Sequence, residues 1–195
     1  MSDAKLNDPT TEKTRLDRVL SPILAYGARH YGEAITQYAH AVQCARLAQE
    51  HGCAPAMIAA ALLHDVGQFI DDAGNKAEQD GSDGLHEETG AAFLSPDFGP
   101  EVTEPVRLHV GAKRYLCAVE EGYRAGLSTA SELSLQLQGG PLAGDAIAAF
   151  ESEPFFADAL LLRRFDDAAK RTDWAVPPLE TYRPLLAALL LPAPA

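Results

Sequence analysis

The sequence predicts an all-α protein, a bundle of helices folded as one domain. Apolar residues recur three and four positions apart along most of its 195 residues, which places them on one face of a helix. No segment alternates apolar and polar residues in the manner of a half-buried strand. Clusters of glycine and proline, such as the GGP at 139–141, separate the periodic segments and mark where helices end.

The first part of the chain contains three helical segments. Apolar positions recur from residue 12 to residue 28, where Pro22 predicts a kink or a boundary. The next helix covers 36–50 and stops at His51-Gly52, where His51 is expected only to cap the helix end. The segment 54–64, APAMIAAALLH, is apolar on nearly every side, which predicts a central, buried helix.

The rest of the chain continues this pattern after one interruption. Residues 71–85 are acidic, rich in glycine and without periodicity, which predicts an exposed loop. The helical pattern resumes at His86. Further helices are expected at 100–119, 128–137, 143–152, 155–170 and 179–191.

The composition limits the classes of partner. A formal net charge of -12 and a pI near 4.8 argue against nucleic acid, because neutralising phosphates requires a basic face. No apolar run is long enough to span a membrane, and the polar N-terminus lacks the apolar core of a signal peptide. The three widely spaced cysteines form neither a disulfide framework nor a zinc ribbon. We therefore expect a soluble, cytoplasmic protein.

Three of the six histidines, His40, His64 and His109, lie inside or at the end of apolar helices. An unpaired imidazole in such a place costs about 1–3 kcal/mol, so three of them in one small domain indicate a shared partner. We interpret that partner as a divalent metal ion, because neutral imidazole and carboxylate both bind such ions. The alternative is a buried polar network without metal.

Carboxylates accompany these histidines. Asp65 directly follows one of them, and the segment RRFDDAAK adds Asp166 or Asp167 from a late apolar helix. His86 and His109 lie between the His-Asp pair and that final carboxylate. The order along the chain is therefore His, His-Asp and Asp, with two further histidines available as ligands.

Two cations lie at helical spacing from candidate ligands. Lys113 is four residues after His109, so it projects from the same face of its helix. Arg163 is three residues before Asp166, a spacing that favours it over Arg164. We expect both cations to face the shared centre. Each one alone is equally consistent with a solvated side chain or with pairing to the acidic excess.

A hydroxyl and a carboxylate complete this set of pocket residues. Ser131 opens the helical stretch SELSLQLQ, and a hydroxyl at a helix start suits an oxyanion. With the two cations it would bind a compact dianion such as phosphate or phosphonate. Glu33 shares a helix face with Gln37 and His40, and would hold a cation at the other end of the substrate.

The motif LLHDVG follows an apolar helix and is flanked by His and Asp in the order described above. This arrangement resembles the HD-domain superfamily, all-helical metalloproteins that mostly hydrolyse phosphate esters. The resemblance implies an HD-domain helical bundle that holds two metal ions bridged by Asp65. The implied ligands of the first ion are His40, His64, Asp65 and Asp166, and those of the second are His86, His109 and Asp65.

The resemblance also implies which of the two neighbouring aspartates is the last ligand and how far the domain extends. Superfamily members place this aspartate four residues before a helical lysine, and Lys170 stands at that distance from Asp166. Asp167 would then face elsewhere. The implied domain is the whole chain, 1–195, with a core at about 30–172 on which N-terminal and C-terminal helices pack.

Longer segments resemble a narrower group of this superfamily. They are YGEAITQYAHAVQCARLA, AAALLHDVG, RLHVGAKRYLCA, SELSLQLQGGP and LRRFDDAAK. They are similar to the mixed-valent diiron oxygenases that cleave the carbon–phosphorus bond of 1-hydroxyphosphonates. This implies an enzyme with two iron ions, Fe(II)/Fe(III), and O2 as co-substrate. Its substrate would be a small organophosphonate of the 1-hydroxy-2-(trimethyl)aminoethylphosphonate type, and its products phosphate and glycine or glycine betaine.

The resemblance further implies which residues act. The catalytic residues would be Asp65, His86 and His109, and the phosphonate would be bound by Lys113, Arg163 and Ser131. Two positions depart from the group's pattern. His30 stands where members have a tyrosine that gates the second iron, with Tyr31 one place later, and Gln68 replaces a frequent histidine in the pocket.

Two other functions are compatible with the same residues. An HD-domain phosphohydrolase would use these ligands around metals without redox chemistry, and would act on a phosphomonoester or nucleotide. A binding or regulatory module would keep the metal site without catalysis. The additional histidines His86 and His109, together with RLHVGAKRYLCA, favour the oxygenase. We expect a monomer or a small homo-oligomer.

Overall fold

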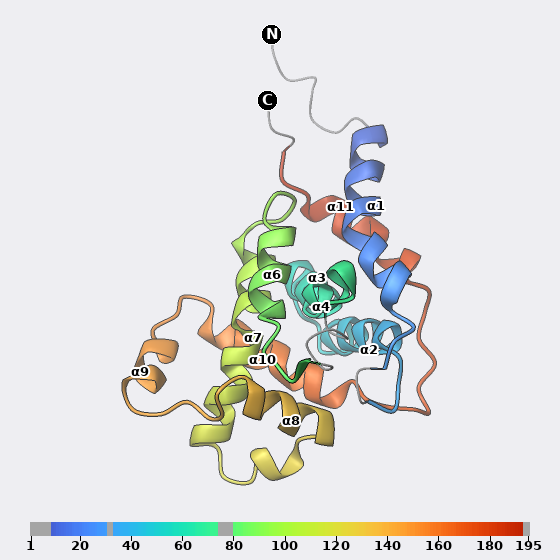
Figure 1. The fold of residues 1–195 in the computed structure, drawn as a ribbon. Coiled ribbons are helices and arrows are strands. Elements are labelled where there is room, and N and C mark those ends of the chain that lie inside the picture. Colours follow the sequence, from blue (N-terminus) through green and yellow to red (C-terminus); the bar gives the residue numbers. More distant parts are fainter. Residues whose placement is uncertain (1–8, 31–32, 74–79, 193–195) are drawn as a thin grey trace.

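The structure, a computed structural model, describes residues 9–30, 33–73 and 80–192, and these form a bundle of helices (Figure 1). The helices are α1 (Pro9–Tyr26), α2 (Gln37–Glu50), α3 (Pro55–Leu63), α4 (Val66–Phe69), α6 (His86–Leu94), α7 (Pro100–Val119), α8 (Thr129–Leu137), α9 (Asp145–Glu151), α10 (Phe156–Ala168) and α11 (Arg183–Leu189). Within the same described ranges the chain also forms the 3-10 turns η1 (Ile70–Asp72), η2 (Arg124–Gly126) and η3 (Leu179–Tyr182). Among the described residues the only β pairing is an isolated bridge between Phe98 and Leu190. The all-α prediction is confirmed.

Two helix boundaries differ from the sequence prediction because of proline. α1 runs through Pro22 without a boundary, since the Arg18 carbonyl, left without an amide donor, accepts a hydrogen bond from Ser21 Oγ at 2.9 Å. The predicted helix 179–191 is divided into η3 and α11. Pro184 lies in the first turn of α11, where its missing amide hydrogen is not needed.

The predicted loop at 71–85 lies partly outside the described residues. Of its described residues, Ala73 and Asp80 are helical, and 81–85 follow an irregular path. Asp71, Asp72 and Leu85 have φ values of 52°, 56° and 46°, a conformation typical of tight turns. The chain therefore turns sharply on either side of this segment.

The apolar helix α3 lies in the middle of the bundle, packed against α2, α7, α10 and α11 (Figure 1). Ala59, Ala60 and Ala61 are completely buried, and their small side chains allow neighbouring helices to approach closely. The prediction of a central, buried helix is confirmed. This helix places the His-Asp pair that follows it deep inside the molecule.

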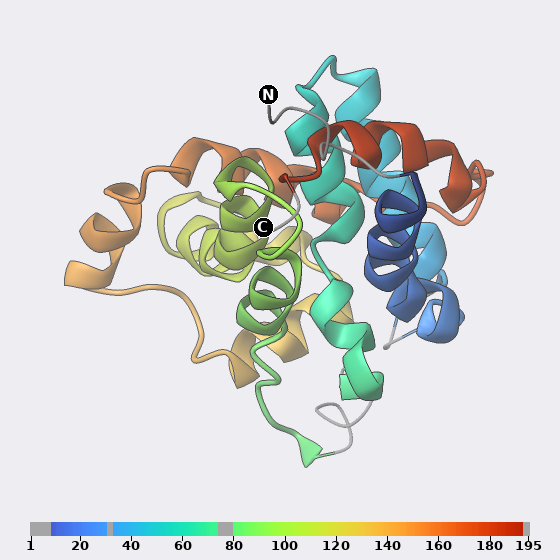
Figure 2. The same cartoon turned by 90° about the horizontal axis from the view of Figure 1, so that it is seen from above.

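The two ends of the described chain pack on this core. α1 and α11 lie side by side (Figure 1), and Leu20, Ile23 and Leu186 belong to the same hydrophobic cluster as α3. α9 instead projects from the bundle, as the view from above shows (Figure 2). None of the described helices is long and apolar enough to cross a membrane.

Candidate metal centre and anion pocket

Four predicted ligands from three parts of the chain meet beside the end of α3. His40 of α2 and His64, which follows α3, bring their Nε2 atoms to 3.3 Å of each other. Asp166 of α10 places Oδ1 3.2 Å from His40 Nε2, and Asp65 places Oδ2 3.4 Å from His64 Nε2. These four residues, here called the first cluster, are all buried.

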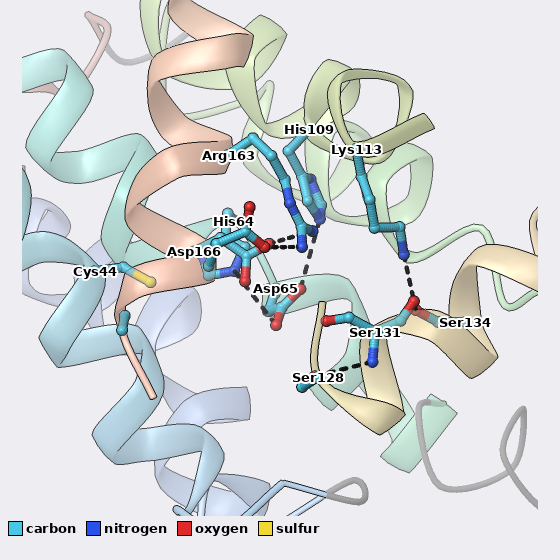
Figure 3. A network of polar contacts seen from close by, with 12 residues as sticks. Cys44, His64, Asp65, His109, Lys113, Ser128, Ser131, Ser134, Arg163 and Asp166 are labelled. Atoms are coloured by element: carbon cyan, nitrogen blue, oxygen red, sulfur yellow. Dashed lines mark hydrogen bonds and ion pairs between the residues drawn. The ribbon is translucent and has the colours of Figure 1, made fainter. Parts of the chain in front are cut away.

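His86 and His109 form a second pair on the other side of Asp65. His86 begins α6 and His109 lies within α7, and their Nε2 atoms are 3.1 Å apart. Asp65 Oδ1 lies 3.3 Å from His86 Nε2 and 3.7 Å from His109 Nε2. The other oxygen, Oδ2, lies on the side of His40 and His64. The Asp65 carboxylate therefore lies between the two groups of histidines, and Figure 3 shows it near the centre of the site.

The hydrogen bonds of the other ring nitrogens indicate why a cation fits here. The Nδ1 atoms of His40, His64 and His109 face backbone carbonyls of Ala169, Ala61 and Val106 at 2.9, 2.9 and 2.7 Å. A neutral ring that donates from Nδ1 has a lone pair on Nε2. In this tautomer the Nε2 atoms of His40, His64 and His109 direct lone pairs toward the centre of the site, where a bound cation would accept them. Metal-binding histidines have this same arrangement, with Nδ1 donating to a carbonyl.

The donor set can thus accommodate two metal ions. Imidazole nitrogens and carboxylate oxygens are ligands for iron and for zinc. One group of mutually close donor atoms comprises Asp65, His86 and His109, and another comprises His40, Cys44 and His64. Cys44, a thiol absent from the predicted ligands, has its Sγ 3.9 Å from His40 Nε2.

The pKa values of the buried groups also indicate that the histidines and Asp65 influence one another's ionisation strongly. Burial acts to lower the pKa of His64, but the adjacent Asp65 carboxylate raises it to about 9. Burial and the neighbouring rings of His86 and His64 lower the pKa of His109 to about 3. Burial opposes ionisation of Asp65, yet His64 holds the pKa of this carboxyl well below its usual range. A cation bound between these groups would displace protons, so its affinity depends on pH.

Gly67 determines how closely α6 approaches the His-Asp pair. A Cβ atom at Gly67 would lie 2.0 Å from the backbone oxygen of His86 and 2.8 Å from the amide nitrogen of Gly90. Both are backbone atoms that cannot move aside independently, so only glycine fits this position. Gly67 thus allows α6 to bring His86 to Asp65. This glycine belongs to the motif LLHDVG, and its role follows only from the packing of α6.

The first cluster and the second pair of histidines both border a cavity of about 280 Å³. All five predicted substrate residues border it: Glu33, Gln68, Lys113, Ser131 and Arg163. Gln37 and Gln138 also border the cavity, and their buried Oε1 atoms have no hydrogen-bond partner among the described residues. A larger and more open groove, about 1140 Å³ in volume, lies beside η2 and α8, and no histidine lines it.

Lys113 faces this cavity from α7. It is only 3 % exposed, and its Nζ donates to Ser134 Oγ at 2.7 Å (Figure 3). Burial and the nearby Arg163 charge lower the pKa of Lys113 to about 8. Ser134 is not among the predicted pocket residues, although it lies three residues after Ser131 on the same helix face.

Arg163 lines the cavity, but its guanidinium is engaged by the protein itself. It donates to Asp166 Oδ2 at 2.7 Å, to Asp167 and to the Tyr123 hydroxyl at 3.0 Å. Burial opposes its charge, but Asp166 and Asp167 raise the pKa of Arg163 above its ordinary value. Of the two neighbouring arginines, Arg163 borders the cavity, whereas Arg164 pairs with Glu120 near the surface. Arg163 fixes the orientation of the Asp166 carboxylate, a role the sequence did not predict.

The aspartate next to the ligand position faces away from the clusters, as predicted. Asp167 accepts a hydrogen bond from the Tyr123 hydroxyl and pairs with Arg163. Tyr123 was not among the predicted site residues. It lies 40 positions before Arg163, and no local pattern in the sequence connects the two.

Ser131 does not open its helix, contrary to the sequence analysis. Ser128 is the N-cap of α8, and its Oγ accepts from the Ser131 amide at 3.1 Å. The Ser131 amide is therefore not free to bind an oxyanion. Its hydroxyl lies at the cavity wall and accepts from Lys170 Nζ at 2.9 Å.

Of the two predicted gating residues, only His30 lies within the described part of the chain. His30 is exposed, its Nδ1 lies 3.3 Å from the Glu33 carbonyl, and it is not part of the cavity wall. Tyr31 lies outside the described residues. His51 caps α2, as predicted, with its amide and its Nδ1 both near the Leu47 carbonyl.

Comparison with known proteins agrees with this geometry. Residues 38–137 match the family described as HD domain. The chain belongs to the HD-domain family. It is 47 % identical to hydroxymethylphosphonate dioxygenase of Gimesia maris over 158 residues, which are 80 % of this chain and 79 % of that protein. It is 40 % identical to [1-hydroxy-2-(trimethylamino)ethyl]phosphonate dioxygenase (glycine-betaine-forming) of Leisingera caerulea, over 80 % of each chain. The resemblance on which the sequence analysis relied is confirmed.

Proposed function

We propose that this chain is an O2-dependent diiron oxygenase that cleaves the carbon–phosphorus bond of a 1-hydroxyphosphonate, giving phosphate and a carboxylate. The observation that carries the proposal is the position of Asp65, whose two oxygens face two separate groups of histidines. Two relatives that share 47 % and 40 % of their aligned residues with this chain are named as hydroxyphosphonate dioxygenases. Their substrates, hydroxymethylphosphonate and 1-hydroxy-2-(trimethylamino)ethylphosphonate, define the proposed class.

In this proposal the two ions are iron. The first would be held by His40, His64, Asp65 and Asp166, and the second by His86, His109 and Asp65. An Fe(II)/Fe(III) pair supplies the one-electron chemistry with O2 that zinc or magnesium cannot supply. The Nδ1–carbonyl contacts of three of the histidines support this assignment, because they fix each ring with Nε2 toward the centre.

The chain's own contribution is to bind and orient the dianion. Lys113 lies on the cavity wall four residues after His109, so a phosphonate held by its ammonium lies beside the second pair of histidines. Ser134 holds that ammonium in place. Arg163 maintains Asp166 in its ionised form and fixed orientation. Holding the substrate in this position lowers the activation free energy of the reaction, because binding has already restricted the relative motion of the reacting groups.

Two further proposals concern the chain as a whole. The hydrophobic cluster shared by α1, α3 and α11 supports our proposal that the chain is a single domain. The three cysteines are free, which supports our expectation of a reducing, cytoplasmic compartment.

The proposal is tested with protein loaded separately with iron and with zinc. Each form is incubated with hydroxymethylphosphonate, with 1-hydroxy-2-(trimethylamino)ethylphosphonate and with p-nitrophenyl phosphate, in air and without oxygen. We expect the iron-loaded protein to release phosphate from at least one of the two hydroxyphosphonates in air. The zinc-loaded protein, and either form without oxygen, should release none. Phosphate release from the monoester by the zinc form without oxygen would instead identify a phosphohydrolase, and an inert protein would indicate a binding module.

A further inference from the structure

His86 differs from the other candidate histidine ligands in the surroundings of its Nδ1 atom. The Nδ1 atoms of His64 and His109 each face a backbone carbonyl three residues earlier in the chain, in the preceding helical turn. His86 is the first residue of α6, and Leu85 before it has a φ of 46°. Because no helical turn precedes His86, no carbonyl lies at that spacing, and another group must face its Nδ1.

The carboxylate of Glu87 lies beside this nitrogen. Its Oε2 is 3.6 Å from His86 Nδ1. Glu87 is only 8 % exposed, and Oε2 has no hydrogen-bond partner in the part of the chain that the structure describes. A buried carboxylate oxygen without a donor is costly. Since hydrogen bonds between nitrogen and oxygen are about 2.7–3.2 Å long, a small rotation of either side chain would complete one here.

The position of Glu87 at a helix start does not by itself account for its burial. Glu87 and Glu88 both belong to the first turn of α6, where the helix dipole stabilises a carboxylate. Glu88 is exposed and has this stabilisation without leaving water. Glu87 bears the additional cost of desolvation, which a specific donor must offset. The Nδ1–H group of His86 is in position to be that donor.

We propose that Glu87 is a positioning residue, whose carboxylate accepts a hydrogen bond from His86 Nδ1 and so directs Nε2 of that ring toward Asp65. His86 Nε2 lies 3.3 Å from Asp65 Oδ1. A neutral ring that donates from Nδ1 keeps its lone pair on Nε2, so Glu87 selects the tautomer that can bind a cation. This inference rests on the proposed function, because it concerns the second ion of that metal centre.

The charge of Glu87 distinguishes His86 from the three histidines whose Nδ1 atoms face carbonyls. A carboxylate partner makes an imidazole more basic and therefore a stronger ligand. Loss of such a partner typically weakens metal binding by about tenfold to hundredfold. We therefore expect Glu87 to strengthen the binding of the second ion and not that of the first.

The test uses zinc alone, since zinc binds imidazole and carboxylate ligands without any redox step. The full chain is freed of metal with a chelator and titrated with zinc, and calorimetry gives the affinity of each of the two ions. Glu87→Ala should weaken the binding of one ion by about tenfold to hundredfold and leave the other unchanged. Glu87→Gln keeps an acceptor without its charge, so its loss should be smaller.

Glu88 supplies the matched control. Glu88→Ala removes the same charge from the same helical turn at an exposed position, and should change neither affinity by more than about twofold. A second readout is NMR of the zinc-loaded protein labelled with 15N in histidine. Hydrogen bonds to a charged acceptor are shorter and stronger, so the His86 Nδ1–H proton should resonate further downfield in the native protein than in Glu87→Gln.

The outcomes separate this inference from the proposed function. Zinc affinities that Glu87→Ala leaves unchanged, or weakens equally for both ions, would overturn the inference, as would an equal loss in Glu88→Ala. If Glu87→Ala does not fold, the affinities of Glu87→Gln and its Nδ1–H signal decide the matter. A protein that shows the expected zinc affinities but, with iron, releases phosphate from no hydroxyphosphonate would contradict the proposed function alone. A native protein that binds fewer than two zinc ions would contradict both.

Discussion

Replacing Arg163 with glutamine would leave the buried Asp166 carboxylate without its guanidinium partner. Arg163 is 3 % exposed and makes hydrogen bonds to Asp166, Asp167 and Tyr123, all of which the variant loses. Removing one partner of a buried ion pair costs about 3–5 kcal/mol. For a chain of this size each kcal/mol lowers Tm by about 2–4 °C, so we expect a fall of about 6–20 °C.

The neighbouring Arg164 supplies the matched control for this variant. Its side chain is 44 % exposed and pairs with an equally exposed Glu120. Such pairs contribute about 0–1 kcal/mol, so Arg164→Gln should lower Tm by no more than about 4 °C. Tm is measured by differential scanning calorimetry, and bound iron by elemental analysis. We expect Arg163→Gln also to lose iron, because Asp166 is no longer held in place.

Two results would refute this reasoning. Equal losses of stability in the two variants would mean that the buried pair contributes nothing beyond a surface pair. If Arg163→Gln kept its Tm and its iron but bound phosphonate weakly, the result would mean that Arg163 contacts the substrate, as expected from the sequence. Orienting the Asp166 carboxylate would then not be its role.

Three further variants test other parts of the site. His86→Ala should reduce bound iron from two ions to one and abolish phosphate release while Tm changes little, and an unfolded protein would contradict this by assigning His86 a structural role. Gly67→Ala should cost about 3 kcal/mol, because its Cβ would meet the His86 backbone oxygen at 2.0 Å, whereas Gly126→Ala, with no atom within 4 Å, should change the unfolding free energy by less than about 0.5 kcal/mol. Because burial lowers the pKa of Lys113 to about 8, the ammonium that binds phosphonate is present below that pH and lost above it. We therefore expect kcat/KM to fall as pH rises through about 8, and Lys113→Arg to extend the active range upward; a profile that is flat to pH 10 would contradict this.

The helices could be predicted from the sequence because their information is local. The spacing of apolar residues determines which face of each segment is buried, and α3 was recognised as central because it has no polar face. Helix boundaries were less predictable where a single contact decides them. Pro22 lies inside α1 because Ser21 supplies the hydrogen bond that proline removes, and Ser131 is not the cap of α8 because Ser128 is.

The candidate ligands were found from the sequence because the HD pair and its flanking residues follow a recognisable order. The partners of the other pocket residues were not found, since they lie far apart along the chain. Glu33 and Lys170 are separated by 137 positions, and Arg163 and Tyr123 by 40. Spacing shows which face a side chain shares, but only the packing of helices shows which groups it meets. The role inferred for Arg163 depends on that packing.

The most direct test of the central claim is the ratio of O2 consumed to phosphate released. Iron-loaded protein is mixed with hydroxymethylphosphonate in an oxygen-electrode cell, and phosphate is assayed in the same sample. The diiron oxygenase proposed here predicts one O2 consumed for each phosphate released, and no phosphate when oxygen is removed. Phosphate released at the same rate without oxygen uptake would contradict it.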